Sequence, residues 1–273
     1  MPMIASPKHL VVRVFNAFGL DIRRHRSVTP TRTSMVGGLT QLARLGFKPQ
    51  TLIDVGVAYQ TSELYETFKD ARILLVEPLV EFEPFLRKIC TAYDAQYILA
   101  AAGETPGTAT LNVRPDKVAS SLLREVEGSA VESSPRTVPV ITIDEACLER
   151  NLRGPFLIKV DVQGAELQVL AGAKRTLLET EAVILEVSLF GFWAGGPQFY
   201  DVIERMKQFG FVAYDICGFL YRPFDNALCQ VDMIFARDNG VFRQSHVYAT
   251  PEQLEDQLRK MQAQFAELER KSS

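Results

Sequence analysis

The sequence predicts an α/β fold in which helices cover both faces of a mainly parallel β-sheet whose last strand is antiparallel. Short apolar runs alternate with amphipathic helical segments through the middle of the chain, which is typical of a parallel sheet. The last two apolar runs, residues 211–217 and 229–237, have no helical pattern between them. Since a parallel crossover needs about a dozen residues or more, this pair is expected to be antiparallel. The 273 residues, of which 47% are hydrophobic, suffice for one large domain core.

The expected elements alternate regularly except in one region. The predicted strands are residues 51–56, 72–78, 96–103, 156–162, 182–188 and the closing pair, and the predicted helices are 61–68, 80–90, 165–179 and 198–209. Two further strands, 108–113 and 137–143, interrupt this alternation. A Ser-rich loop separates them, and its length fits either a mobile lid or disorder.

Three domains are expected: a basic N-terminal helical segment, 1–48; the core domain, 49–240; and a C-terminal helix, 250–273. The first segment contains a predicted helix over 8–18 and eight Lys and Arg residues against a single acid, Asp21. A solvated basic face and a peripheral membrane contact are both compatible with this charge.

The first segment also contains a second short helix. It is expected after Gly37 and Gly38 and ends at Gly46.

The C-terminal helix begins with a capping box, because Thr250 is followed three residues later by Gln253. Apolar residues then recur at the spacing of a coiled coil: Leu254, Leu258, Met261, Phe265 and Leu268. Two interpretations are equally supported: a helix that docks on its own domain, and a short coiled coil that forms a homodimer.

Composition argues against several classes of protein. A net charge of −3 provides no global field for nucleic acid. The three histidines lack metal-ligand spacing, and the four cysteines form no CxxC pair, so no metal site is expected from them. No apolar stretch approaches the roughly 20 residues of a membrane span, and no signal peptide is recognised, so a cytoplasmic location is expected.

Ligands of open α/β sheets bind at the carboxyl ends of the strands, so the residues there are candidates for the site. The first strand ends in Asp54-Val55-Gly56, without the glycine-rich loop that a dinucleotide requires. An acid beside one glycine suits the positively charged S-adenosyl-L-methionine. Glu77, followed by Pro78, is expected to accept hydrogen bonds from ribose hydroxyls, and Ala102 is expected at the same cofactor site.

The fourth and fifth parallel strands carry the catalytic candidates. Asp161 is expected beside the methyl donor, where it orients or deprotonates an acceptor hydroxyl. Lys159 is either a catalytic residue or half of a structural salt bridge, and Glu166 either functions or stabilises the start of a helix. Glu186 ends the fifth strand and is the third catalytic candidate.

The substrate candidates lie further along the chain. Because the last strand is antiparallel, its first residues, including Gln230 and Asp232, are expected at the same edge of the sheet. Trp193, in an aromatic loop after the fifth strand, is expected to contact substrate or to cover the core. Asp161, Glu186 and Asp232 are expected to converge on substrate hydroxyls, with a divalent cation as the less favoured alternative.

Several motifs resemble the FkbM family of methyltransferases over about residues 51–237. The most specific is LIKVDVQGAELQVLAGA, residues 157–173, which resembles the family block K-x-D-x-E-G-x-E-x-x-V/L-x-G-A with Gln163 in place of Glu. The segments TLIDVG, LVEP, SSLL, VITID, ILEVS and QVDMIFAR follow in the family's order. The first motif departs from the family pattern D-V-G-A-N-x-G, since Ala58 replaces Asn and Gln60 replaces the second glycine.

The resemblance implies a Rossmann-like class I methyltransferase sheet, S-adenosyl-L-methionine as cofactor, and O-methylation of a small or glycan acceptor. A non-catalytic binding module with the same fold is the alternative, and Gln60 is its main support. A nicotinamide-dependent oxidoreductase ranks last, because the glycines that bind phosphate are absent.

Overall fold

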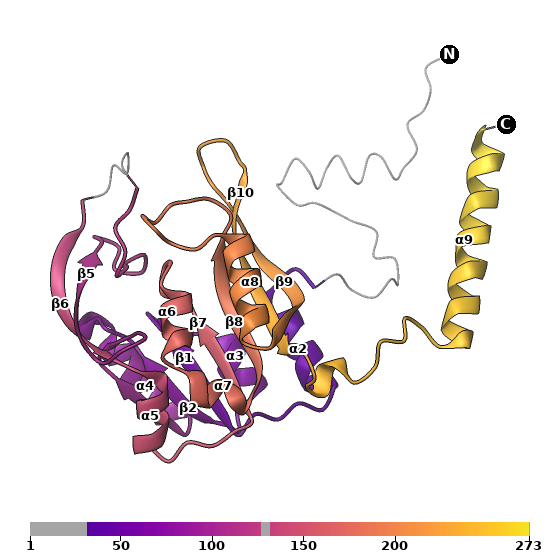
Figure 1. The fold of residues 1–273 in the computed structure, drawn as a ribbon. Helices are drawn as coiled ribbons and strands as arrows, with labels where there is room; N and C mark the ends of the chain where they lie inside the picture. Colours follow the sequence, from indigo (N-terminus) through magenta and orange to yellow (C-terminus); the bar gives the residue numbers. More distant parts are fainter. Residues whose placement is uncertain (1–31, 127–131, 273) are drawn as a thin grey trace. The chain divides into compact units, whose positions relative to one another are not determined.

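The computed structural model describes residues 32–126 and 132–272. Seven strands form the central sheet in the order β3-β2-β1-β7-β8-β10-β9 (Figure 1). Every strand pair in it is parallel except the two pairs that β10 makes, with β8 and β9. The predicted fold class and its antiparallel last strand are therefore confirmed. The strands are β1 (Thr51–Val55), β2 (Arg72–Val76), β3 (Ala95–Ile98), β7 (Phe156–Val160), β8 (Thr180–Ser188), β9 (Phe211–Tyr221) and β10 (Leu228–Arg237).

Two apolar layers enclose this sheet, because successive side chains of each strand point to opposite faces. Leu52 of β1 packs on one face with buried residues of three helices, α2 (Met35–Arg44), α3 (Ser62–Thr67) and α4 (Glu83–Ala92). Ile53 packs on the other face. The helices on that second face are α5 (Ile143–Glu149), α6 (Glu166–Ala171), α7 (Lys174–Leu178) and α8 (Phe199–Gln208).

The single strand predicted over 96–103 is divided between two sheets. Its first part is β3, which pairs with β2, whereas β4 (Ala101–Ala102) pairs with β6 (Ser134–Ile141) in a three-stranded sheet completed by β5 (Gly107–Val113). The predicted strand 137–143 also ends early, because Thr142 accepts a hydrogen bond from the Glu145 amide and starts α5.

The helix predicted over 165–179 is two helices, α6 and α7, separated at Gly172 and Ala173. A Cβ atom at Gly172 would lie 2.0 Å from the Gly103 carbonyl oxygen, so this close contact requires glycine. Asp144 of α5 accepts hydrogen bonds from the amides of Arg175 and Thr176 and so caps the start of α7.

Helix α2 begins earlier than predicted and includes Gly37 and Gly38, with Ser34 as its N-cap. Leu39 and Leu42 are fully buried, so α2 belongs to the core rather than to a separate basic segment. Residues 1–31 lie outside the described residues, as do the predicted first helix and the proposed membrane contact.

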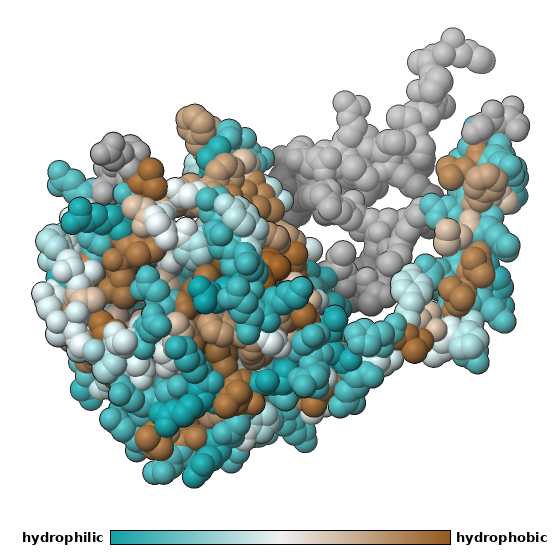
Figure 2. Space-filling view, in the orientation of Figure 1, coloured by the Kyte–Doolittle hydropathy of each residue, from teal (hydrophilic) through white to brown (hydrophobic). Residues whose placement is uncertain are grey.

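Helix α9 (Pro251–Ser272) has the predicted capping box, in which Thr250 and Gln253 exchange two hydrogen bonds. Leu254, Met261 and Phe265 are exposed by 44%, 59% and 64%, and Figure 2 shows apolar side chains on the surface of α9. The helix docked on its own domain and the homodimer both stay predictions. Within the described residues, no helix is both long and apolar enough to span a membrane.

Gly172→Ala tests the close contact between α6 and the segment after β4. We expect a loss of stability of about 1–3 kcal/mol, because the added methyl group displaces the Gly103 carbonyl from a packed interior. Thermal unfolding measures the effect. Gly37→Ala is the matched control, because the added Cβ would lie 3.4 Å from its nearest neighbour, Arg32 Cβ, within a helix. Equal melting temperatures for the two variants would contradict the close contact at Gly172.

Candidate functional site

A cavity of about 370 Å³ lies at the carboxyl ends of β1, β2, β7 and β8 and at the start of β10. Most of the predicted site residues meet there, because parallel strands present their carboxyl ends at one edge. We call it the donor cavity because the sequence predicts the methyl donor at this edge of the sheet. The predicted residues that line it are Gly56, Glu77, Pro78, Ala102, Lys159, Asp161, Glu186 and Asp232. Gln60 lines it as well and is exposed.

Lys159 is a buried cation held between two carboxylates. Its Nζ lies 3.6 Å from Asp54 Oδ1 and 3.3 Å from Asp161 Oδ2. Burial lowers the pKa of Lys159, but Asp161 and Asp54 outweigh this and hold it above its usual value. The lysine is therefore charged, and its structural salt bridge joins β7 to its neighbour in the sheet, β1.

Asp54, expected at the cofactor, is fully buried and does not line the cavity. Its Oδ2 accepts a hydrogen bond from the Tyr65 hydroxyl at 2.5 Å, and its Oδ1 faces Lys159. Burial, with Asp54 as a second cause, raises the pKa of Tyr65, so the hydroxyl stays neutral and can donate. Asp54 thus orients the Lys159 ammonium from the buried side of the site. The sequence pattern alone did not reveal Tyr65 as the hydrogen-bond partner of Asp54.

Two further carboxylates face each other across the antiparallel pair, because Glu186 of β8 is in register with Asp232 of β10. Burial is the main cause that raises the pKa of Asp232 to about 6, and the nearby Asp161 adds to it. Burial also raises the pKa of Glu186, followed by the charges of Asp161 and Glu166. The cavity therefore contains two carboxyl groups that keep their protons to a higher pH than exposed carboxyl groups do.

Glu77 projects from the end of β2 into the cavity and is held by backbone. Its Oε2 accepts a hydrogen bond from the Ala58 amide at 3.0 Å, and its Oε1 accepts one from the Leu79 amide at 2.9 Å. Each oxygen keeps a second lone pair for a ligand. The loop that supplies Ala58 turns at Gly56, where φ is +79° and a Cβ would lie 1.8 Å from the Asp161 carbonyl oxygen.

Glu166 stabilises the loop between β7 and α6. Its Oε1 accepts hydrogen bonds from the amides of Val162 and Gly164, at 3.1 and 3.0 Å. The structural interpretation of Glu166, a role at the start of a helix, therefore fits its contacts. Burial raises its pKa to about 7.

Gln163, in the same loop, joins two catalytic candidates. Its Nε2 lies 3.0 Å from Asp161 Oδ1 and 2.7 Å from Glu186 Oε1, and it donates to both. Gln163 also lines a second cavity of about 590 Å³, the acceptor cavity. The sequence marked Gln163 only as a departure from a family pattern; its place two residues beyond Asp161 is the signal that could have found it.

The acceptor cavity contains the other two substrate candidates, Trp193 and Gln230. Its aromatic wall includes Phe190, on which the Arg222 guanidinium stacks at 4.0 Å from the ring centroid. Arg222 also forms a bidentate ion pair with Asp225 in the turn between β9 and β10. The sequence did not single out Arg222, because no local motif links it to the aromatic loop.

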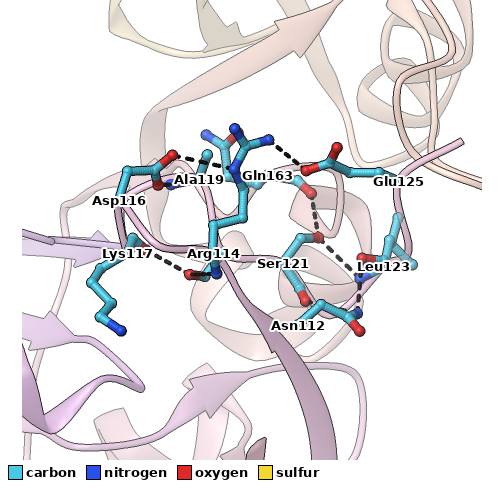
Figure 3. Close-up of polar contacts among 10 residues, drawn as sticks. Asn112, Arg114, Asp116, Lys117, Ala119, Ser121, Leu123, Glu125 and Gln163 are labelled. Atoms are coloured by element: carbon cyan, nitrogen blue, oxygen red, sulfur yellow. Dashed lines mark hydrogen bonds and ion pairs between the residues drawn. The ribbon is translucent and has the colours of Figure 1, made fainter. Parts of the chain in front are cut away.

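The Ser-rich loop forms walls of both cavities, and its described part is tied down by hydrogen bonds (Figure 3). The Ser121 hydroxyl donates to the Gln163 carbonyl oxygen at 2.6 Å, and the Leu123 amide donates to the same hydroxyl at 2.9 Å. Arg114 and Glu125 form an ion pair that faces the acceptor cavity. The part of this loop before residue 127 is therefore an ordered wall beside Gln163.

Carboxylates outnumber cations in the donor cavity, with Glu63, Glu77, Asp161, Glu186 and Asp232 against Lys117 and Lys159. Such a lining favours a ligand that carries positive charge and disfavours phosphate. In the part of the chain that the structure describes, no group of three His, Cys, Asp or Glu side chains is arranged for a metal ion.

A family model described as the methyltransferase FkbM domain matches residues 54–213, which is more than half of the chain. The chain belongs to the FkbM methyltransferase family. The match begins at Asp54 and includes every donor-cavity residue from β1, β2, β7 and β8 discussed above.

One curated relative of this FkbM-family chain is the 2-O-methyltransferase NoeI of Sinorhizobium fredii. It is 34% identical over 79 residues, which are 29% of this chain and 32% of the relative. The chain thus spans about a third of the length of the curated relative it matches.

Two solved structures are similar at low identity. The magnesium protoporphyrin IX methyltransferase of Synechocystis PCC 6803, with bound SAM, is 11% identical with a TM-score of 0.40, over 87% of this chain and 100% of that chain. The 1,6-didemethyltoxoflavin-N1-methyltransferase of Burkholderia thailandensis is 13% identical with a TM-score of 0.40, over 87% and 92%. Neither similarity is high enough to bear on this chain's substrate.

Glu166→Gln tests the buried carboxyl in the loop after β7. The raised pKa means that folding favours the protonated acid, so this stability is present below pH 4.5 and is lost as the pH rises through about 7. Glutamine keeps the acceptor oxygen and does not titrate. We expect its stability relative to wild type to improve between pH 5.5 and 8.5, by an amount on the order of 2 kcal/mol. Thermal unfolding of both proteins at the two pH values measures this change. A stability difference between Glu166→Gln and wild type that is the same at both pH values would contradict the raised pKa of Glu166.

Proposed function

We propose that this chain is an S-adenosyl-L-methionine-dependent methyltransferase that methylates a hydroxyl group of a carbohydrate-like acceptor. The observation that carries the proposal is the donor cavity itself, an acidic pocket at the carboxyl ends of the parallel strands of an FkbM-family domain. The cofactor has a sulfonium, an ammonium and a vicinal ribose diol, and the groups that line the cavity suit all three.

Each part of the cofactor has a candidate partner. Glu77 keeps one lone pair on each oxygen and would bind the ribose hydroxyls. Gly56 lets its backbone lie close to the Asp161 carbonyl, with which any side chain at this position would collide. The cofactor can therefore approach the backbone here. Asp161 would face the positive charge, and Pro78 and Ala102 supply apolar wall for the adenine side. Asp54 is left out of this set because it is buried behind Lys159.

The acceptor cavity supports a polyhydroxylated, ring-shaped acceptor. Its wall contains aromatic side chains, including Phe190 and Trp193, together with amide, hydroxyl and ionic groups. Aromatic faces pack against the apolar side of a ring, while amides such as Gln230 exchange hydrogen bonds with hydroxyls. The similarity to a 2-O-methyltransferase over 79 residues agrees with oxygen as the methylated atom.

When bound, the cofactor supplies an electrophilic methyl group on a positively charged sulfur. The protein's part is to hold the acceptor oxygen in line with that methyl group and to accept the proton that the hydroxyl loses. Gln163 contacts Asp161 and Glu186 of the donor cavity and lines the acceptor cavity, so the reacting groups would meet beside it.

Calorimetric titration with S-adenosylhomocysteine tests the proposal. We expect wild type to bind in the micromolar range and Glu77→Gln to bind at least about tenfold more weakly, because the amide loses one acceptor and the charge that strengthens both hydrogen bonds. Glu149→Gln is the matched control: this exposed acid of α5 pairs with Arg150, neither residue lines the cavity, and the change should leave affinity unaltered.

Methyl transfer is then assayed with radiolabelled donor and a panel of methyl glycosides. Binding together with transfer supports the proposed enzyme. Binding without transfer to any glycoside would support the non-catalytic module or another acceptor class, and no binding by wild type would contradict the proposed function.

A further inference from the structure

Both oxygens of Asp161 are occupied, which argues against this residue as the base. Oδ2 pairs with the Lys159 ammonium at 3.3 Å, and Oδ1 accepts a hydrogen bond from Gln163 at 3.0 Å. A proton on Asp161 would remove one of the two carboxylates that flank the buried Lys159 ammonium, and the shorter of its two ion pairs would be lost. Asp161 is therefore built to remain a counter-ion.

Glu186 has the opposite arrangement. Its Oε1 accepts one hydrogen bond, from Gln163 at 2.7 Å, while no donor to Oε2 is found among the described residues. The side chain lines the donor cavity, next to the loop that also forms the acceptor cavity. Glu186 thus has one uncommitted carboxylate oxygen, in the wall of the donor cavity and beside Gln163, which lines the acceptor cavity.

We propose that Glu186, rather than Asp161, is the base that removes the acceptor proton, and that donor binding ionises it. The inference rests on the proposed methyl transfer. A proton leaves the acceptor hydroxyl for Glu186 as an oxygen lone pair forms the new C–O bond. The C–S bond breaks, its electron pair stays on sulfur as a thioether, and the proton passes from Glu186 to solvent.

The surroundings of Glu186 make its charge sensitive to the donor. Burial and the nearby Asp161, Glu166 and Asp232 favour the neutral acid, and Lys159 opposes them. The added positive charge of a sulfonium in the same cavity favours the carboxylate. In the free protein Glu186 therefore holds its proton to a higher pH than it does after the donor binds.

Gln163 is a positioning residue in this scheme. Its amide nitrogen has two hydrogens, and it donates to Asp161 and to Glu186. Its backbone has a φ of +60°, and its carbonyl oxygen is fixed by the Ser121 hydroxyl. A glutamate at this position would add a third carboxylate and remove both donors.

Proton release on binding separates the two candidate bases without requiring an acceptor. S-adenosylmethionine and S-adenosylhomocysteine differ by one methyl group and one positive charge. Calorimetry at pH 7.5 in buffers of different ionisation enthalpy counts the protons released with each ligand. We expect wild type to release more protons with S-adenosylmethionine, by up to about one per site.

The variants assign that proton. Glu186→Gln should abolish the difference between the two ligands. Asp232→Asn is the comparison variant, because its acid lies in register with Glu186 and lines the same cavity; it should keep the difference and shift its midpoint to lower pH, since the Asp232 charge favours the neutral form of Glu186. Gln163→Glu should keep the difference and shift its midpoint to higher pH, which supplies a second test if Glu186→Gln fails to fold.

Three results would overturn the proposal: no difference between the ligands in wild type, a difference that survives in Glu186→Gln, or a midpoint that Gln163→Glu does not move. Failure of wild type to bind either ligand is a distinct result and would refute the proposed function along with the base. With an acceptor from the glycoside panel, Glu186→Gln should lower kcat about 10²–10⁴-fold while the affinity for the uncharged S-adenosylhomocysteine is retained.

Discussion

The buried ion pairs of Lys159 are the interaction on which the site depends. Asp54 and Lys159 are buried register partners on adjacent central strands, and the Tyr65 hydroxyl donates a hydrogen bond to the Asp54 oxygen that does not face Lys159. Removal of one partner from such a pair typically costs about 3–5 kcal/mol. The same lysine offsets the charge of Asp161, so one buried cation allows several carboxylates to gather at a single edge of the sheet.

Register explains why those carboxylates share one side. Ile184 and Ile234 point into the apolar layer beneath α2 and α3, and Glu186 and Asp232, two residues away on each strand, are directed to the same face. On this face of the sheet, the apolar core and the polar cavity are therefore separated by only two residues along each strand. Gln163 connects that cavity to the acceptor cavity, and Ser121 fixes the loop that carries Gln163.

Much of the fold was predictable, because periodicity and turn residues report on local structure. The prediction of one helix over 165–179 was wrong in one respect, because the structure has two helices there. The break between them depends on the contact of Gly172 with the Gly103 carbonyl, which is distant in sequence. The strand 96–103 was wrong for a similar reason, as its two halves pair with different sheets.

The donor-cavity candidates were predictable from strand ends, where topology alone brings side chains together. Sequence could not tell that Asp54 lies behind Lys159, or that Gln163 donates to two carboxylates, because both depend on side-chain direction. Arg222 and Glu125 reach the acceptor cavity through long-range contacts that leave no local pattern.

A crystal structure of the protein with S-adenosylhomocysteine tests the central claim most directly. We expect the ribose hydroxyls within hydrogen-bond distance of Glu77 and the sulfur in the cavity lined by Asp161 and Glu186, with Lys159 still paired to Asp54. A ligand bound elsewhere, or one whose ribose avoids Glu77, would contradict the assignment of this acidic cavity as the donor site.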